Sequence, residues 1–207
     1  MRKIVLALVL LTAVGACANE VTFQTDVTYG CFGIGCTPTS STASIPDLSF
    51  QGVGFGPGTT TGGNLTIDLG TFTLTDSSST VFLGPLTNST FTAQVNFLLP
   101  SSIDGGQSAS YEAFIIGGVV KNIDGDSWLV FGGPQYFTFY GGSFEFQVDD
   151  LNLNAWGKNG IDSQTLIGEV TNAAGSTGYA AVPEPATLSL LGCGLTGLAA
   201  LRRKRRT

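Results

Sequence analysis

The chain has 207 residues, of which 29 are glycine, 14 are phenylalanine and only 12% are charged, and it contains no histidine. The formal charge is −6, but residues 19–182 hold 14 acidic side chains against two lysines, a net charge of −12. A region this acidic repels phosphate backbones, which argues against nucleic-acid binding. Without histidine, the chain can form no Ser-His-Asp triad, no Cys-His pair and no imidazole zinc site.

The first 18 residues have the pattern of an export signal. A basic pair and an apolar run occupy residues 2–14, and Ala16-Cys17-Ala18 matches the small-residue pattern before a cleavage site. The run is shorter than the ~20 residues of a permanent span. We therefore predict a signal peptide at 1–18 and a mature chain that starts at Asn19. Residues 14–17 also resemble a lipobox, in which Cys17 would be lipidated; we favour the ordinary cleavage.

The mature body alternates apolar and polar residues in short segments bounded by glycine, proline and polar turns, and no stretch of it has helical periodicity. Residues 19–171 are therefore predicted to form an antiparallel β-sandwich of jelly-roll or immunoglobulin-like type. Gly70, where the apolar face changes side, is expected to mark a bulge, and Gly141-Gly142 a hairpin turn. The expected strands are 21–28, 48–53, 65–75, 91–97, 110–121, 127–132, 136–140, 143–148 and 164–171.

Two segments of the body have a loop-like composition. Residues 37–63 are rich in Thr, Ser, Gly and Pro, and we expect a long surface loop with one strand inside it. Residues 172–181, NAAGSTGYAA, are small and polar, which is typical of a flexible linker. The predicted organisation is thus a sandwich domain at 19–171 that a linker connects to the C-terminal segment.

Cys31-Phe-Gly-Ile-Gly-Cys36 is a candidate disulfide. Disulfides form and persist in exported proteins, and the two glycines allow a small ring to close. Redox catalysis would favour two intervening residues and a nearby basic group, and neither is present. Two cysteines without histidine also make a poor metal site, so we predict a structural bond between Cys31 and Cys36.

Asn122, Asp124 and Asp126 place three side-chain oxygens at alternate positions around a glycine, which suits a weak calcium site. The stretch lacks the distal glutamate of a complete calcium loop. An ordinary Asp-Gly turn between strands is therefore the favoured interpretation, and Ca²⁺ is the only cofactor considered. Asp149-Asp150 could add ligands if the fold brought them near, although neighbours on a strand point to opposite faces.

Four aromatic residues, Trp128, Tyr136, Tyr140 and Trp156, could form a surface on which sugars stack. Aromatic residues of sandwiches are more often core residues. Within 136–140, alternation places Tyr136 and Tyr140 opposite the two phenylalanines, so the tyrosines are the better surface candidates. Paired carboxylates, as in a glycosidase, are possible in principle, but the sequence selects no pair and we predict no catalytic residue.

The last 26 residues read VPEPATLSLLGCGLTGLAALRRKRRT. Residues 186–201 are uncharged and apolar, and the basic residues 202–206 can extend a short transmembrane segment by snorkelling. The positive-inside preference keeps this basic cluster in the cytoplasm and places the body outside the inner membrane. The residues before each proline in 182–185 are pushed towards extended conformations, in which a processing enzyme can bind them.

This arrangement resembles the PEP-CTERM sorting signal of Gram-negative bacteria over residues 182–207. The resemblance implies processing by exosortase, with Pro183, Glu184 and Pro185 as recognition residues, and an association with exopolysaccharide and biofilm. It implies an exported protein, anchored in the inner membrane before processing and then found in the envelope, on the cell surface or in the matrix. We expect a non-enzymatic protein of this kind. A carbohydrate-binding module, with calcium assisting, is the alternative, and a carboxylate-based glycan-active enzyme is the last.

Overall fold

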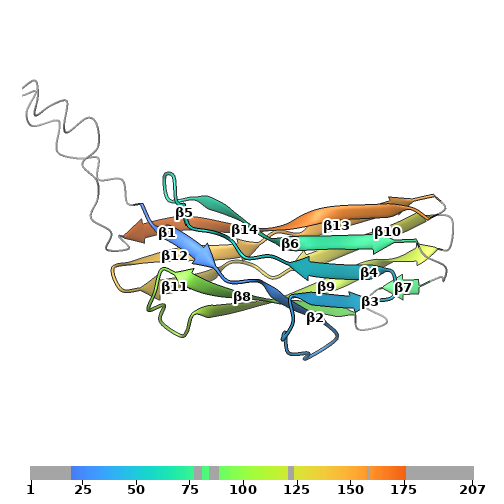
Figure 1. Ribbon diagram of the computed structural model, residues 1–207, viewed down its shortest axis with the longest axis horizontal. Helices are drawn as coiled ribbons and strands as arrows, with labels where there is room; N and C mark the ends of the chain where they lie inside the picture. Colours follow the sequence, from blue (N-terminus) through green and yellow to red (C-terminus); the bar gives the residue numbers. More distant parts are fainter. Residues whose placement is uncertain (1–19, 77–80, 84–88, 121–123, 158, 176–207) are drawn as a thin grey trace, which may run out of the picture. The chain divides into compact units, whose positions relative to one another are not determined.

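The computed structural model shows an antiparallel β-sandwich, which confirms the predicted fold class (Figure 1). The chain divides into two compact units, residues 1–177 and 178–207, and all described strands belong to the first. Every regular element of the described part is a strand, and each paired strand runs antiparallel to its neighbour. The structure describes residues 20–76, 81–83, 89–120, 124–157 and 159–175.

One sheet has eight strands. Its main path runs in the order β13 (Leu151–Trp156), β10 (Asp124–Phe131), β9 (Ser108–Val120), β8 (Thr90–Leu99), β1 (Thr22–Thr25) and β5 (Gly58–Thr59). Two further strands join this path, β2 (Tyr29–Phe32) beside β8 and β7 (Val81–Leu83) beside β9.

The other sheet has six strands. They follow the order β11 (Gln135–Phe139), β12 (Gly142–Val148), β14 (Ile161–Gly175), β6 (Leu65–Thr75), β4 (Leu48–Gly52) and β3 (Thr42–Ile45). Alternation along each strand turns one side chain inward and the next outward, so each sheet has one core face and one outer face.

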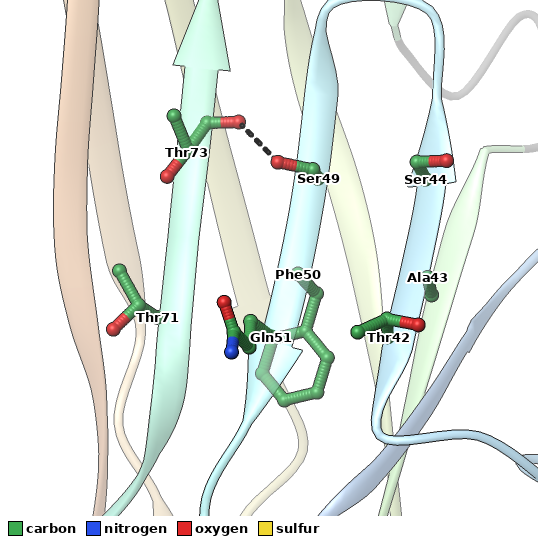
Figure 2. Close-up of a pocket in the computed structure, with 8 residues that line it drawn as sticks. All are labelled: Thr42, Ala43, Ser44, Ser49, Phe50, Gln51, Thr71 and Thr73. Atoms are coloured by element: carbon green, nitrogen blue, oxygen red, sulfur yellow. Dashed lines mark hydrogen bonds between the residues drawn. The ribbon is translucent and has the colours of Figure 1, made fainter.

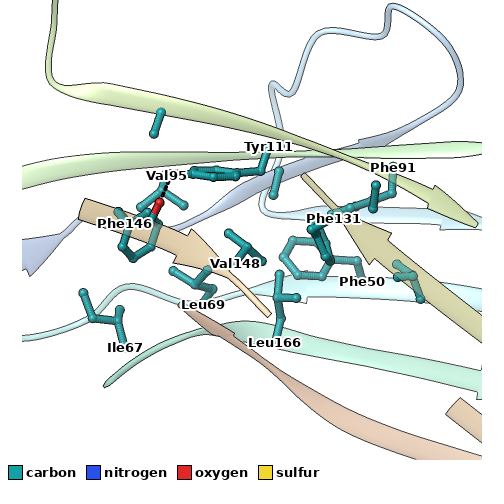
Figure 3. Packing of buried hydrophobic residues seen from close by; sticks show 14 of the residues in the cluster. Phe50, Ile67, Leu69, Phe91, Val95, Tyr111, Phe131, Phe146, Val148 and Leu166 are labelled. Atoms are coloured by element: carbon teal, nitrogen blue, oxygen red, sulfur yellow. Dashed lines mark hydrogen bonds between the residues drawn. The ribbon is translucent and has the colours of Figure 1, made fainter. Parts of the chain in front are cut away.

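Phenylalanines from both sheets interlock between the layers (Figure 3). Phe50 of β4 and Phe72 of β6 contact Phe91 of β8, with ring centroids 4.9 and 4.8 Å apart. In the same core, Phe144 of β12 meets Phe23 of β1 at 4.9 Å. Such edge-to-face pairs contribute about 0.5–1.5 kcal/mol each beyond the burial of their area. The aromatic content noted in the sequence is therefore mainly core, and it holds one sheet against the other.

The expected strands exist, with boundaries that differ by a few residues. The strand at 65–75 has its predicted bounds, and Gly70 lies at a bulge: Leu166 pairs with Gly70 and Ile167 with Asp68, so Leu69 is the extra residue. The Asp68 carboxylate accepts a hydrogen bond from the Gly70 N–H at 3.0 Å. This bulge lets β6 keep buried residues on both sides of the change of face.

Three boundary predictions were wrong. Residues 37–63 contain β3, β4 and β5 where one strand was expected, because β3 pairs with β4 and β5 pairs with β1. The hairpin turn is Tyr140-Gly141, because Gly142 belongs to β12 and pairs with Phe139 of β11. The linker cannot begin at residue 172, because β14 continues to Gly175.

Ala173, inside that last stretch, shows why the strand continues. Its side chain is buried, and its N–H donates to the Gly63 carbonyl at 2.9 Å. The remaining residues of the predicted linker, 176–181, and the predicted signal peptide 1–18 lie outside the described residues.

Candidate functional site

A pocket of about 330 Å³ lies on the outer face of the six-stranded sheet, over β3, β4 and β6 (Figure 2). Its polar lining is made of hydroxyl and amide groups, and none of its eight lining residues is charged. The Ser49 hydroxyl donates to the Thr73 carbonyl at 3.5 Å, and the Thr73 hydroxyl lies 2.9 Å from that of Ser163. This pocket can exchange hydrogen bonds with a polar ligand, but its lining offers no acid or base for catalysis.

Carboxylates of the described domain accept hydrogen bonds from the fold itself. The Asp104 carboxylate accepts from the Thr138 hydroxyl at 2.7 Å, and that of Asp150 from the Phe131 N–H at 2.8 Å. Asp162 accepts from the N–H of Asn154 at 2.7 Å. Because β13 ends the eight-stranded sheet, this last bond satisfies an edge N–H that would otherwise face water. These carboxylates position loops and strand edges.

Asp149 lies in a group of acidic residues after β12. Partial burial is the main cause that raises the pKa of its carboxyl, and the nearby charges of Glu169 and Asp150 raise it further. Among the described residues, no cluster of three or more metal-binding acidic or cysteine side chains is arranged to hold an ion. The arrangement around Asp149 is thus a local accumulation of charge.

The predicted calcium residues fall at the start of β10. Asp124 is the first residue of the strand, opposite Trp156 of β13, and Asp126 is exposed on the outer face. Gly125 lies between them in the strand, with its Cα beside the core, so this Asp-Gly-Asp stretch is not itself a turn. Asn122 and the side chain of Asp124 lie outside the described residues.

Cys31 and Cys36 are joined by a disulfide, with Cα atoms 6.1 Å apart. Gly33 and Gly35 have positive φ angles of 110° and 66°, which let the chain turn back within the ring. Cys31 itself is in β2 and pairs with Thr92 of β8. The bond therefore fastens the turn that follows β2 to the sheet, and its geometry is that of a structural element.

The four aromatic candidates are exposed, but on different sheets. Tyr136 and Tyr140 are 65% and 91% exposed on β11 and at its hairpin tip, in the six-stranded sheet. Trp128 and Trp156 are 51% and 70% exposed on β10 and β13, in the eight-stranded sheet. The four therefore do not form a single stacking surface.

Sequence reasoning missed Phe114, which is 61% exposed, and Ile116, which is 46% exposed. Both lie on β9, and Ile116 is directly opposite Trp128. Glu112 points to the same face of the strand as these two residues, but because the opposite face of β9 is also apolar, this pattern alone does not show which face is outward.

These features define an all-β sandwich domain followed by a separate C-terminal segment. Residues 181–206 of that segment match the family model of the PEP-CTERM protein-sorting motif. The chain therefore carries a PEP-CTERM sorting motif in this segment, which implies export, a membrane-anchored precursor and processing by exosortase. No curated protein and no solved structure gives a significant match to the chain.

The predicted membrane segment 186–201 and the recognition residues Pro183, Glu184 and Pro185 lie outside the described residues. Within the part of the chain that the structure does describe, no helix has the length and apolar character needed to cross a membrane.

Proposed function

We propose that the sandwich is a non-enzymatic component of the cell envelope or extracellular matrix, and that exosortase-dependent sorting delivers it to exopolysaccharide. The observation that supports this proposal is the use of carboxylates as structural acceptors, seen at Asp104, Asp150 and Asp162. A glycosidase needs two carboxylates that face each other across a substrate cleft. Carboxylates that accept hydrogen bonds from the domain's own N–H and hydroxyl groups are instead suited to a structural role.

The test compares the full chain in its host with and without exosortase. Intact mass and cell fractionation report whether the C-terminal segment is removed and where the protein goes. We expect loss of the segment and recovery in the exopolysaccharide fraction only when exosortase is present. An unchanged mass and location would refute the sorting proposal. Appreciable turnover of polysaccharides by the purified mature protein would refute the non-enzymatic role.

Carbohydrate binding is the second candidate. Tyr140, 91% exposed at the β11–β12 hairpin tip, favours it, because an aromatic ring held so far into solvent is available for stacking. Loss of glycan-array binding on Tyr140→Ala would support a tyrosine site. We carry the calcium hypothesis with this candidate: if Ca²⁺ assists binding, EDTA should weaken it and lower Tm, and equal values with and without EDTA would remove calcium from the proposal.

A further inference from the structure

Three large apolar side chains adjoin one another on the outer face of the eight-stranded sheet. Phe114 and Ile116 project from β9 and Trp128 from β10, with exposures of 61, 46 and 51%. Ile116 and Trp128 are directly opposite in the strand pairing, and Phe114 is directly opposite the half-buried Val130. Directly opposed side chains lie about 5 Å apart and diagonal ones about 7–8 Å apart, so the three form one patch. We call Phe114, Ile116 and Trp128 the aromatic platform.

Polar side chains border the aromatic platform on the same face. Asn152 of β13 is directly opposite Trp128, on the side away from Ile116. Asp126 and Glu112 are the next outward residues along β10 and β9, and both are exposed. The border therefore consists of an amide and two carboxylates, which offer hydrogen-bond acceptors on this face of the sheet and amide donors beside Trp128.

The size of the platform argues against a second copy of the chain as its occupant. Full burial of an aromatic side chain covers about 150–250 Å², so the exposed fractions correspond to about 300 Å² in total. A stable protein–protein interface buries about 800 Å² on each partner. A patch of about 300 Å² is within the range of functional patches on monomers and matches a smaller ligand.

Charge narrows the class of ligand. The described residues include no lysine or arginine, and the chain has no histidine, so none of the described residues on this face can neutralise an anion. Glu112 and Asp126 instead repel phosphates and acidic sugars. A neutral ligand with both apolar faces and many hydroxyl groups satisfies the size, the aromatic rings and the border together.

We propose that the aromatic platform is a binding site for a neutral glycan chain. The C–H faces of its sugar rings stack on Trp128 and Phe114, and its hydroxyl groups exchange hydrogen bonds with Asn152, Asp126 and Glu112. The inference rests on the proposed non-enzymatic function in one respect, that the glycan is bound and not cleaved. It places binding on the sheet opposite Tyr136 and Tyr140, so variants distinguish the two sites.

The experiment is affinity electrophoresis of the processed protein, purified from its host. The gels contain hydroxyethylcellulose, neutral dextran, the neutral fraction of the host exopolysaccharide, or anionic alginate. Trp128→Ala removes the centre of the platform. Ile161→Ala is the control, because it removes a 67% exposed apolar side chain from the other sheet, and Tyr140→Ala tests the competing tyrosine site. Far-UV circular dichroism and Tm establish that each variant is folded, and sedimentation measures the oligomeric state.

We expect retardation by at least one neutral polysaccharide and none by alginate. Because truncation of a central aromatic contact commonly costs tenfold or more in affinity, Trp128→Ala should weaken the retardation at least tenfold and Ile161→Ala should not. Equal retardation of Trp128→Ala and wild type, loss only in Tyr140→Ala, or no retardation by any neutral polymer would overturn the proposal. A dimer that Trp128→Ala disrupts would also overturn it in favour of a second copy. None of these outcomes bears on exosortase processing or on hydrolysis, which test the proposed function separately.

Discussion

Tyr111 provides a sharp test of how the two layers are held together. Its ring is buried and its hydroxyl donates to the Phe146 carbonyl on the opposite sheet at 2.6 Å (Figure 3). Burial raises the pKa of Tyr111 well above the usual value, and a backbone hydrogen bond with Gln135 opposes the rise only in part. Tyr111→Phe removes the hydroxyl and keeps the ring, so it isolates this inter-sheet bond.

Two magnitudes follow for Tyr111→Phe. At pH 7, loss of a buried hydrogen bond should lower the free energy of unfolding by about 1–2 kcal/mol. Above pH 10 the unfolded tyrosine ionises while the folded one stays protonated, so the wild type loses about 1.4 kcal/mol of stability for each further pH unit. This loss begins at the unfolded pKa near 10 and ends only at the raised folded pKa. The variant has no hydroxyl at this position, so it does not undergo this loss of stability.

The assay is urea unfolding of both processed proteins at pH 7, 9 and 11, followed by circular dichroism. Other ionising groups are common to both proteins, so their difference reports Tyr111 alone. We expect the wild-type advantage to be constant between pH 7 and 9 and to shrink by about 1.4 kcal/mol at pH 11. A difference that stays the same at pH 7 and 11 would show that the Tyr111 hydroxyl is not held in the folded core, and would refute the packing described for β9 against β12.

Three further substitutions test separate parts of the fold by urea midpoint. Gly30→Ala should lower the free energy of unfolding by about 1–3 kcal/mol, because the added Cβ would lie 2.6 Å from two core phenylalanine rings. Gly133→Ala is the control and should leave stability unchanged, because the space around Gly133 is open. Equal effects of the two substitutions would contradict this packing. Cys31→Ser should cost roughly 2 kcal/mol, as should reduction of the wild type, and a reduced protein of unchanged stability would argue against a structural disulfide. Asp162→Ala should cost about 1 kcal/mol and speed hydrogen exchange at the Asn154 amide, and unchanged exchange would contradict the edge contact.

Local alternation was sufficient to find the long strands. In residues 65–75 the pattern includes its own interruption at Gly70, so both the strand and the bulge could be predicted. The two residues of β5 form a strand only because they pair with β1, a partner about 37 positions away in sequence. Residues 151–156 also alternate, so the same pattern predicts β13, which was missing from the expected strands.

The aromatic platform could not be assigned from sequence because β9 is apolar on both faces. Along β9, Tyr111, Ala113 and Ile115 point to one face of the sheet, and Phe114 and Ile116 point to the other. Which set faces the core depends on the opposite sheet, where Phe146 accepts the Tyr111 hydrogen bond. Because that contact places Tyr111 in the core, and side chains alternate along the strand, Phe114 and Ile116 must face outward. The site therefore follows from tertiary packing, while the sorting motif, which needs only local order along the chain, was predicted from sequence.

The sorting motif and the sandwich occupy different units of the chain, and this separation has a functional consequence. Among the described residues, the core member nearest the C-terminus is Ala173, and the last strand ends at Gly175. The boundary between the two compact units follows Thr177, before the motif at 181–206. The whole matched motif thus lies outside the unit that contains the described core, and cleavage within the motif would leave that unit intact. Sorting can proceed to completion without removing any residue of the aromatic platform, so the proposed glycan site is compatible with both the precursor and the processed protein.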